Sequence, residues 1–272
     1  MLYMIKESIN RWIEQRKLRG YYVFSYEDVR TAYPSKSEEY ISTSLTRLIS
    51  SKVIINPAKG FYVIVPTEYA LSGIVPAVFY IDRMMDHLNR EYYVGLLNAA
   101  SFYGAAHQRP QSFCVINDNA PIRNGERAGI NFMFIRAKYI HTDYLIPHKG
   151  KLGKINVSSP ELTAIDLVAY QDKIGGLNRA CTVLSELADS LDFDNVNHDF
   201  FTIHGLPVFQ RLGYILEVVL EENELAEKLY LKMKESGFVK FRKIPFKIGK
   251  PTVGCEQNAK WKVIINQEID ID

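Results

Sequence analysis

Cysteine is scarce in this 272-residue sequence, which holds only Cys114, Cys181 and Cys255. The three lie far apart, form no C-x-x-C pair and are odd in number, so the sequence indicates neither a disulfide framework nor a zinc site. Such sparing use of cysteine is typical of proteins in a reducing compartment. We therefore expect a cytoplasmic protein.

Long hydrophobic runs are also missing. The longest apolar stretch, residues 69–81, is interrupted by Gly73 and Pro76 and is too short to span a bilayer. The first residues become charged at Lys6 and contain no apolar core followed by small residues, so we expect no secretory signal. No Gly/Ser-rich linker, repeat or low-complexity tract separates domains. The sequence thus predicts docked domains and no membrane partner.

The patterns that usually carry catalysis or metal binding are lacking as well. The six histidines form neither H-x-x-x-H nor H-x-H, and no G-x-S-x-G occurs. The glycine-containing stretch at residues 150–154, GKLGK, lacks the spacing of a phosphate loop, and GGLNR at residues 175–179 resembles one even less. We therefore expect no catalytic residues, no cofactor, no metal and no enzyme.

A few isolated polar residues could still be functional. Glu161, Asp166 and Asp172 lie on or just after one expected helix, where capping and surface roles explain them without catalysis. Arg211 lies between apolar residues, so we expect a buried ion pair there, with a place in a functional groove as the alternative.

What the sequence does contain is an ordinary globular composition, 47% hydrophobic and 24% charged, with a strongly segregated charge. Residues 182–227 hold ten acids against one base, and residues 228–262 hold ten bases against two acids, although the net charge is only +2. Either the two segments face one another and balance, or the basic segment faces phosphates. We favour the second, with Arg242, Lys243 and Lys247 as contacts.

The N-terminal pattern is that of a winged helix-turn-helix over residues 1–68. Apolar spacing predicts a helix over residues 2–18, a short helix capped by Ser25, and a third helix over residues 37–51. Two β-runs around turn residues then predict a hairpin with Lys59 at its tip.

The third expected helix is rich in Ser and Thr on the face away from its apolar side. Ile41, Leu45, Leu48, Ile49 and Lys52 cluster on the inner side of the helical wheel. In a winged helix the outward face of this helix enters the DNA major groove, where hydroxyls approach bases and Arg can bind guanine. The predicted DNA contacts in this domain are Ser35, Lys36, Ser37, Glu39, Tyr40, Ser42, Thr43, Thr46, Arg47 and Lys59.

An alternative to DNA binding stays open for this domain. Winged helices also serve as protein-interaction modules, and Glu38 and Glu39 oppose DNA electrostatically. Residues 1–68 hold ten bases and seven acids, a modest positive balance.

The rest of the chain predicts an interdomain region over residues 69–90, with a helix at 76–88, and a C-terminal domain over residues 91–272. That domain alternates helices and strands, so the fold class is α+β: the winged helix followed by a mixed α/β domain with a small sheet and flanking helices. The expected elements are helices at 92–104, 158–171, 207–220 and 222–237, and strands at 111–118, 129–137 and 259–266.

An ordered set of segments in this chain resembles the AbiEi family of antitoxins, the regulator halves of type IV toxin–antitoxin pairs. The segments are KGFYVI at the hairpin, YYVGLLNAASFYGAAHQRPQSFCVI, VSSPELTAIDLV, FQRLGYILE and the closing WKVIIN. The acidic stretch at 187–207 and the segment 247–259 depart from the looser family pattern.

The resemblance implies an N-terminal domain that binds the operator DNA of its own operon and represses it. It also implies a C-terminal antitoxin domain that counteracts a co-encoded nucleotidyltransferase toxin, without a stable complex. The alternative is an enzyme-like antitoxin whose C-terminal domain modifies the toxin or its substrate and whose winged helix serves for docking.

Overall fold

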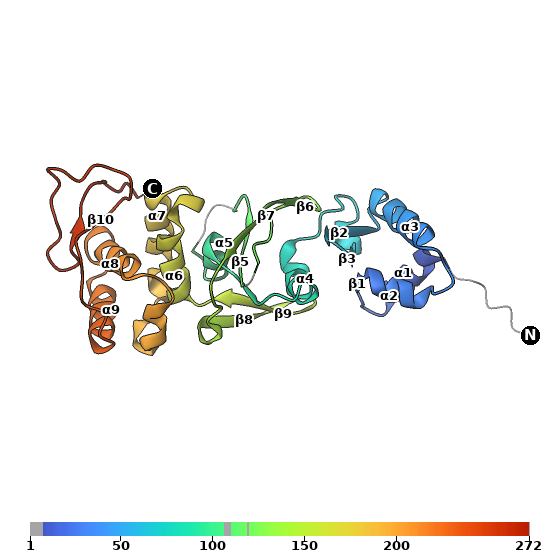
Figure 1. Ribbon diagram of the computed structural model, residues 1–272, viewed down its shortest axis with the longest axis horizontal. Helices are drawn as coiled ribbons and strands as arrows, with labels where there is room; N and C mark the ends of the chain where they lie inside the picture. The colour runs from blue at the N-terminus through green and yellow to red at the C-terminus, as the bar shows by residue number, and fades with distance from the viewer. Residues whose placement is uncertain (1–7, 106–109, 119, 272) are drawn as a thin grey trace, which may run out of the picture. The chain divides into compact units, whose positions relative to one another are not determined.

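The computed structural model describes residues 8–105, 110–118 and 120–271, which fall into two compact units (Figure 1). The first unit comprises the chain up to Tyr93 together with Gln111–Ile140 and Pro147–Asn156. The second comprises Val94–Pro110, His141–Ile146 and the chain from Val157 onward. The functional domain limits expected near residues 68 and 90 stay predictions.

The first unit begins with three helices and a small antiparallel sheet of order β1-β3-β2. The elements are α1 Ile9–Leu18, β1 Val23–Ser25, α2 Tyr26–Ala32, α3 Glu38–Ser50, β2 Ile54–Ala58 and β3 Phe61–Ile64. The expected helices and hairpin are present, and β1 is an addition that pairs Phe24 with Tyr62.

The helix starts follow the capping chemistry of the sequence. Ser25 and Asp28 form a reciprocal capping box, in which each side chain accepts a hydrogen bond from the other's backbone N–H at 3.1 and 2.7 Å. Ser8 caps α1 from an extended conformation, so this helix begins at Ile9. The part of the expected helix before Ser8 lies outside the described residues.

These elements enclose one apolar core, to which every helix and the hairpin contribute. Tyr62 stacks on Phe24 with 5.2 Å between ring centroids, and Trp12 meets the same ring edge-on. This core fixes α3 by its inner side and leaves its other side in solvent. Its buried members are Ile9, Ile13, Phe24, Val29, Ile41, Leu45, Leu48, Ile54 and Ile64.

A second sheet has six strands in the order β6-β7-β5-β4-β9-β8. Strands β5 and β7, expected from their apolar runs, pair in parallel, with Val115 opposite Phe134. The sheet is larger than expected because β6, β8 and β9 lie in segments without a continuous apolar run and β4 lies in a segment expected to be helical. Its strands are β4 Tyr92–Val94, β5 Phe113–Asn117, β6 Gly125–Arg127, β7 Ile130–Arg136, β8 Leu145–Gly150 and β9 Gly153–Ser158.

Two of the expected helices are shorter than predicted. The helix expected over 92–104 begins only at Leu96, because Tyr92–Val94 form β4 and Gly95 is extended; α5 is Leu96–Phe102. Tyr, Tyr and Val are residues that favour strands, which accounts for the difference. The helix expected over 76–88 is a short 3₁₀ turn at Ala77–Phe79 followed by α4, Ile81–His87.

Helices dominate the second unit. They are α5, α6 Pro160–Ala169, α7 Leu177–Leu187, α8 Leu206–Tyr214, continued by a π-helical turn at Ile215–Val219, and α9 Asn223–Glu235. The strand expected over 259–266 is reduced to β11, Val263–Ile264, paired in parallel with β10, Ile244–Pro245. Helix α7 was not expected from the sequence.

Helix α6 lies within the segment 158–171, where a helix is expected, and begins at Pro160. Ser159 caps it by accepting from the backbone N–H of Leu162 at 3.2 Å. Ser158 is fully buried, with its hydroxyl oxygen 2.7 Å from that of Thr163, and Glu161 accepts from the backbone N–H of Asp192 at 2.8 Å.

Helix α8 holds the C-terminal segment by its side chains. The amide of Gln210 donates to the carbonyls of Arg242 and Trp261 at 2.8 and 2.7 Å. The guanidinium of Arg211 donates to the carbonyls of Pro245 and Phe246 at 3.0 to 3.1 Å. The ion pair expected for Arg211 is therefore wrong, since its partners within the described residues are main-chain carbonyls.

Two further features of the described residues bear on function. No helix there is long and apolar enough to cross a membrane. Within the same residues, no three His, Cys, Asp or Glu side chains are grouped closely enough to hold a metal ion.

Candidate nucleic-acid interface

Helix α3 presents an uninterrupted polar face to solvent. Its inner side is formed by Ile41, Leu45 and Leu48, which are at most 9% exposed. Ile49 was expected on that side but is 38% exposed, and Lys52 lies beyond the helix end with a φ of 57°. The exposed members of the predicted contact face are Glu39, Tyr40, Ser42, Thr43, Thr46 and Arg47.

Some of the hydroxyls on this face are engaged within the helix. Thr46 donates its hydroxyl proton to the carbonyl of Ser42 at 2.9 Å, and Ser50 donates to that of Thr46 at 3.0 Å. Such back-bonding satisfies the donor and leaves the oxygen lone pairs directed outward. In this conformation these hydroxyls can accept hydrogen bonds from base amino groups but do not offer a proton.

The start of α3 is built from the three predicted residues 35–37. Ser37 caps the helix by accepting from the backbone N–H of Tyr40 at 3.2 Å, which engages one lone pair of its hydroxyl oxygen. The ammonium of Lys36 lies 4.5 Å from the centroid of the Tyr40 ring, a cation–π contact that keeps the charge beside the helix start. Ser35 is exposed in the turn that joins α2 to α3.

One of the two acids that oppose DNA binding is paired. Arg30 on α2 donates to Glu38 at 2.8 Å, and both side chains are largely exposed. An exposed pair of this kind contributes about 0–1 kcal/mol to stability, but it offsets the negative charge of Glu38 at the start of α3. Glu39 is exposed on the contact face.

The hairpin between β2 and β3 is held firmly at its turn while its lysine stays exposed. The carbonyl of Gly60, a residue with a φ of 71°, accepts from the backbone N–H of Tyr26 at 2.8 Å. The ring Nε2 of His87 donates to the carbonyl of Lys59 at 3.0 Å, and Arg127 donates to that of Pro57 at 3.3 Å. The Lys59 side chain is therefore carried on a fixed backbone.

The three predicted contacts near the C-terminus belong to the second unit. Arg242 and Lys243 are exposed, whereas Lys247 is half-buried and forms an ion pair with Asp172. Lys228 pairs with Asp194 at 2.7 Å, and the hydrogen bond from Lys228 lowers the pKa of Asp194 below its usual value.

Contacts across the charge boundary explain part of the segregation seen in the sequence. Besides the pair of Lys228 and Asp194, Lys260 contacts Glu217 at 3.1 Å and Glu227 at 3.0 Å. The acidic and basic segments thus partly balance one another, as the first of the two interpretations expected.

The surface role expected for Asp166 is wrong. Its side chain is fully buried, and its carboxylate lies 2.7 Å from Nε2 of His204, which is itself mostly buried. The sequence carried a signal for this burial, since apolar residues flank Asp166 on both sides within α6. The pairing with His204 joins segments that are 38 residues apart, a separation no local pattern reveals.

The middle of this chain is similar to a known class of domain. Residues 93–218 match the family model described as the AbiEi antitoxin C-terminal domain. The match confirms the AbiEi resemblance for this part of the chain, whereas the segments KGFYVI and WKVIIN lie outside the matched residues. The family-model match supports the assignment of this protein as an AbiEi-family antitoxin, and hence an antitoxin role.

The chain also resembles a solved structure across most of its length. The crystal structure of the RV2827C protein from Mycobacterium tuberculosis superimposes with a TM-score of 0.67. The comparison covers 94% of this chain and 90% of the other, at 12% sequence identity, so it shows a shared fold alone. No curated protein matches this chain.

Proposed function

We propose that this antitoxin is also a DNA-binding repressor of its own operon, with residues 1–68 acting as a winged helix-turn-helix. The observation that carries the proposal is the exposed polar face of α3, which follows α2 after a short turn. In proteins of this class the second of the paired helices lies in the major groove, and the hairpin contacts the backbone beside it. The arrangement of α3 and Lys59 supports that mode of docking.

Within this proposal the residues of α3 divide by chemistry. Arg47 is the side chain suited to bidentate hydrogen bonding with guanine, and Thr43 can contact a base edge or a thymine methyl group. Ser35 and Lys36, before the helix, are suited to phosphate, as is Lys59 at the hairpin turn. Arg47 and Thr43 thus carry sequence preference, and the lysines carry affinity.

We further propose that the partner of the C-terminal domain is a nucleotidyltransferase toxin encoded beside this gene. The AbiEi match supports a toxin–antitoxin pairing in general, and the identity of the toxin follows the resemblance drawn from the sequence. The proposal includes neutralisation without catalysis by this chain. An assay for nucleotide-dependent modification of the toxin tests that part, because a modified toxin would require the enzyme-like alternative.

The DNA-binding proposal is tested by a gel shift of the full chain with the DNA upstream of its own gene. A shifted band that resists excess shuffled competitor of the same length is the expected result. Equal competition by shuffled and upstream DNA would show that the binding does not depend on DNA sequence. Complete absence of a shift at low salt would instead favour the winged helix as a protein-interaction module.

A further inference from the structure

A pocket of about 390 Å³ opens in the second unit, and none of its lining residues belongs to the α3 face assigned to DNA. Its size lies within the range of small-molecule sites. Its lining contains two lysines and one acid, and one of the lysines, Lys247, is paired with Asp172 outside the lining. The lining residues are Gly175, Gly176, Leu177, Asn178, Lys247, Lys250, Gln267 and Glu268.

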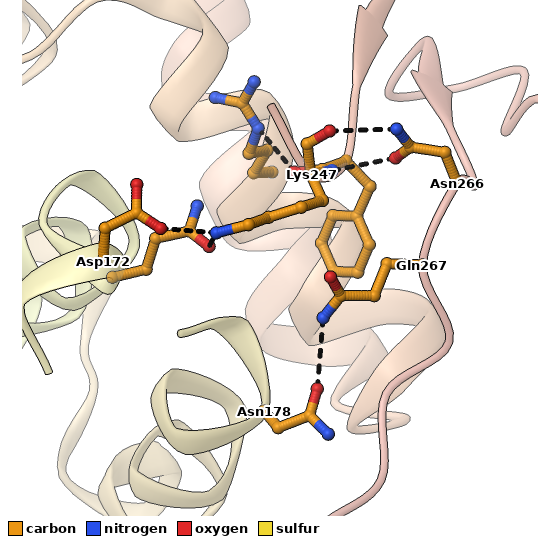
Figure 2. A network of polar contacts seen from close by, with 8 residues as sticks. Asp172, Asn178, Lys247, Asn266 and Gln267 are labelled. Atoms are coloured by element: carbon orange, nitrogen blue, oxygen red, sulfur yellow. Dashed lines mark hydrogen bonds and ion pairs between the residues drawn. The ribbon is translucent and has the colours of Figure 1, made fainter. Parts of the chain in front are cut away.

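The ammonium group of Lys247 is held by two residues that do not line the pocket. Figure 2 shows the Lys247 side chain extended toward Asp172, with which its ammonium forms an ion pair. The same ammonium donates to Oε1 of Gln171, a side chain that is 5% exposed, at 3.3 Å. Because an ammonium has three donors, these two contacts leave one N–H for a ligand.

The loop that carries both lysines is clamped by a single amide. Oδ1 of Asn266 accepts from the backbone N–H of Lys247 at 2.9 Å. Its Nδ2 donates to the carbonyl of Lys247 at 2.9 Å (Figure 2) and to that of Lys250 at 3.1 Å. The backbone at Lys250 is thus held while its side chain stays exposed at the pocket.

The start of α7 and the two glycines before it form part of the pocket lining. Gly175 and Gly176 have φ values of 108° and 97°, a conformation that other residues rarely adopt, and no side chain caps the helix start. Gln267 donates to Oδ1 of Asn178 at 3.2 Å, which ties this turn to the C-terminal segment (Figure 2). The uncapped N–H groups and the helix dipole add to the positive potential of the lysines.

We propose that this pocket binds the phosphate group of a small phosphorylated molecule such as a nucleotide. Lys250 and Lys247 contribute charge-assisted hydrogen bonds, and the α7 turn contributes backbone donors. Glu268, exposed at the pocket, opposes the bound anion. The inference does not depend on DNA binding, because its residues lie in the second unit and include none of the α3 face.

The test is titration of the full chain with inorganic phosphate and, separately, with a nucleoside monophosphate, followed by calorimetry or NMR. We expect saturable binding that Lys250→Gln weakens by about tenfold, the loss of one charge-assisted hydrogen bond. Lys240→Gln, which removes an exposed lysine outside the pocket, should leave the affinity unchanged. Tighter binding of the nucleoside monophosphate identifies a nucleotide as the ligand, and equal binding identifies phosphate alone.

Two isosteric variants separate a binding role from a structural one. Asn178→Asp keeps the acceptor for Gln267 and favours the start of α7, yet its charge should weaken phosphate binding by at least about tenfold. Glu268→Gln should strengthen binding. The proposal is overturned if neither probe binds saturably at millimolar concentration, or if Lys250→Gln and Asn178→Asp bind as the parent does.

Discussion

At the scale of single residues, Arg47 is the side chain on which the proposed DNA recognition most depends. Its replacement by Ala should weaken binding to upstream DNA by about 1–3 kcal/mol and relax the base preference at one position. Thr43→Ala should weaken binding to a smaller extent. Circular dichroism should match the parent in both variants, since both residues are exposed.

The matched control for these two variants is Arg19→Ala, which removes an exposed arginine at the end of α1. It should change affinity equally for all DNA sequences or not at all. If Arg47→Ala and Thr43→Ala keep the parent's affinity and base preference, α3 is not the reading helix.

The thiols of Cys181 and Cys255 should differ in their reactivity toward a thiol reagent. Burial raises the pKa of Cys181 to about 12, so its thiol stays protonated at pH 8, whereas Cys255 is partly exposed. We expect a thiol reagent at pH 8 to label Cys255 in the folded protein and to reach Cys181 only after unfolding. Cys181→Ser should therefore leave the native labelling unchanged; a fall in its extent would show that Cys181 is accessible.

The sequence predicted which residues are exposed better than it predicted the partners of buried polar residues. The outward face of α3 and the cap Ser25 follow from local spacing and local hydrogen bonds. Arg211 and Asp166 find their partners in distant segments, so their roles were misread from the sequence. Ile49 shows a third limit, because a helical wheel does not fix the edge of a buried face.

At the scale of elements, α8 packs closely against the C-terminal segment at Gly213. Gly213 faces the fully buried ring of Trp261, and a Cβ at that position would lie 2.2 Å from ring carbons. Gly213→Ala should lower the free energy of unfolding by about 1–3 kcal/mol or more, because the ring must shift within a packed core. Denaturant unfolding followed by Trp fluorescence measures this.

Gly205→Ala is the control for that experiment, since it changes another glycine of the same helix. A Cβ at Gly205 would meet only Pro207, at an ordinary distance of 3.6 Å. The loss of a glycine N-cap should cost no more than about 1 kcal/mol. Equal stability of the Gly213→Ala variant and the parent would mean that Trp261 does not pack against α8 in solution.

The basic segment near β10 makes a separate prediction about salt. Neutralising Arg242 and Lys243, both exposed, should reduce the slope of log affinity against log salt by about 0.9 for each phosphate that the protein no longer neutralises. Base preference should stay the same. Lys247 is left out because its ion pair with Asp172 would confound the result.

An Arg242→Gln, Lys243→Gln variant with the parent's salt slope would assign these residues to charge balance alone. The ion pairs of Lys228 and Lys260 with acidic residues already account for part of that balance. The N-terminal helices and hairpin would then supply all of the contacts to DNA.

Helices and strands with several apolar residues at regular spacing were predictable from the sequence. Short elements and elements with few apolar residues were not. Strands β5 and β7 and helices α3, α6 and α9 follow from their apolar patterns. Strands β8 and β9 were missed because each has few apolar residues, with a lysine and a glycine at the end of β8 and at the start of β9. Helix α7 was missed although its buried residues Leu177, Ala180, Cys181 and Leu184 recur at helical spacing, since the two preceding glycines are more typical of a loop.

At the scale of the whole molecule, the proposed function has two parts: α3 recognises DNA, and residues 93–218, which match the AbiEi antitoxin C-terminal domain, neutralise the toxin. The family resemblance could be seen in the sequence because it depends only on several segments that follow one another in a fixed order along the chain. The division into two compact units could not be predicted from the sequence, because Gln111–Ile140 and Pro147–Asn156 join the first unit from the middle of the chain.

The most direct test of whether α3 recognises DNA independently of toxin neutralisation uses the full chain carrying both Thr43→Ala and Arg47→Ala. Its binding to the upstream DNA is measured by gel shift, and its ability to rescue cells is measured by co-expression with the neighbouring toxin gene from an unrelated promoter. We predict that the double variant loses preference for upstream over shuffled DNA and still rescues growth. Retention of that preference, or loss of rescue by a folded variant, would contradict the account.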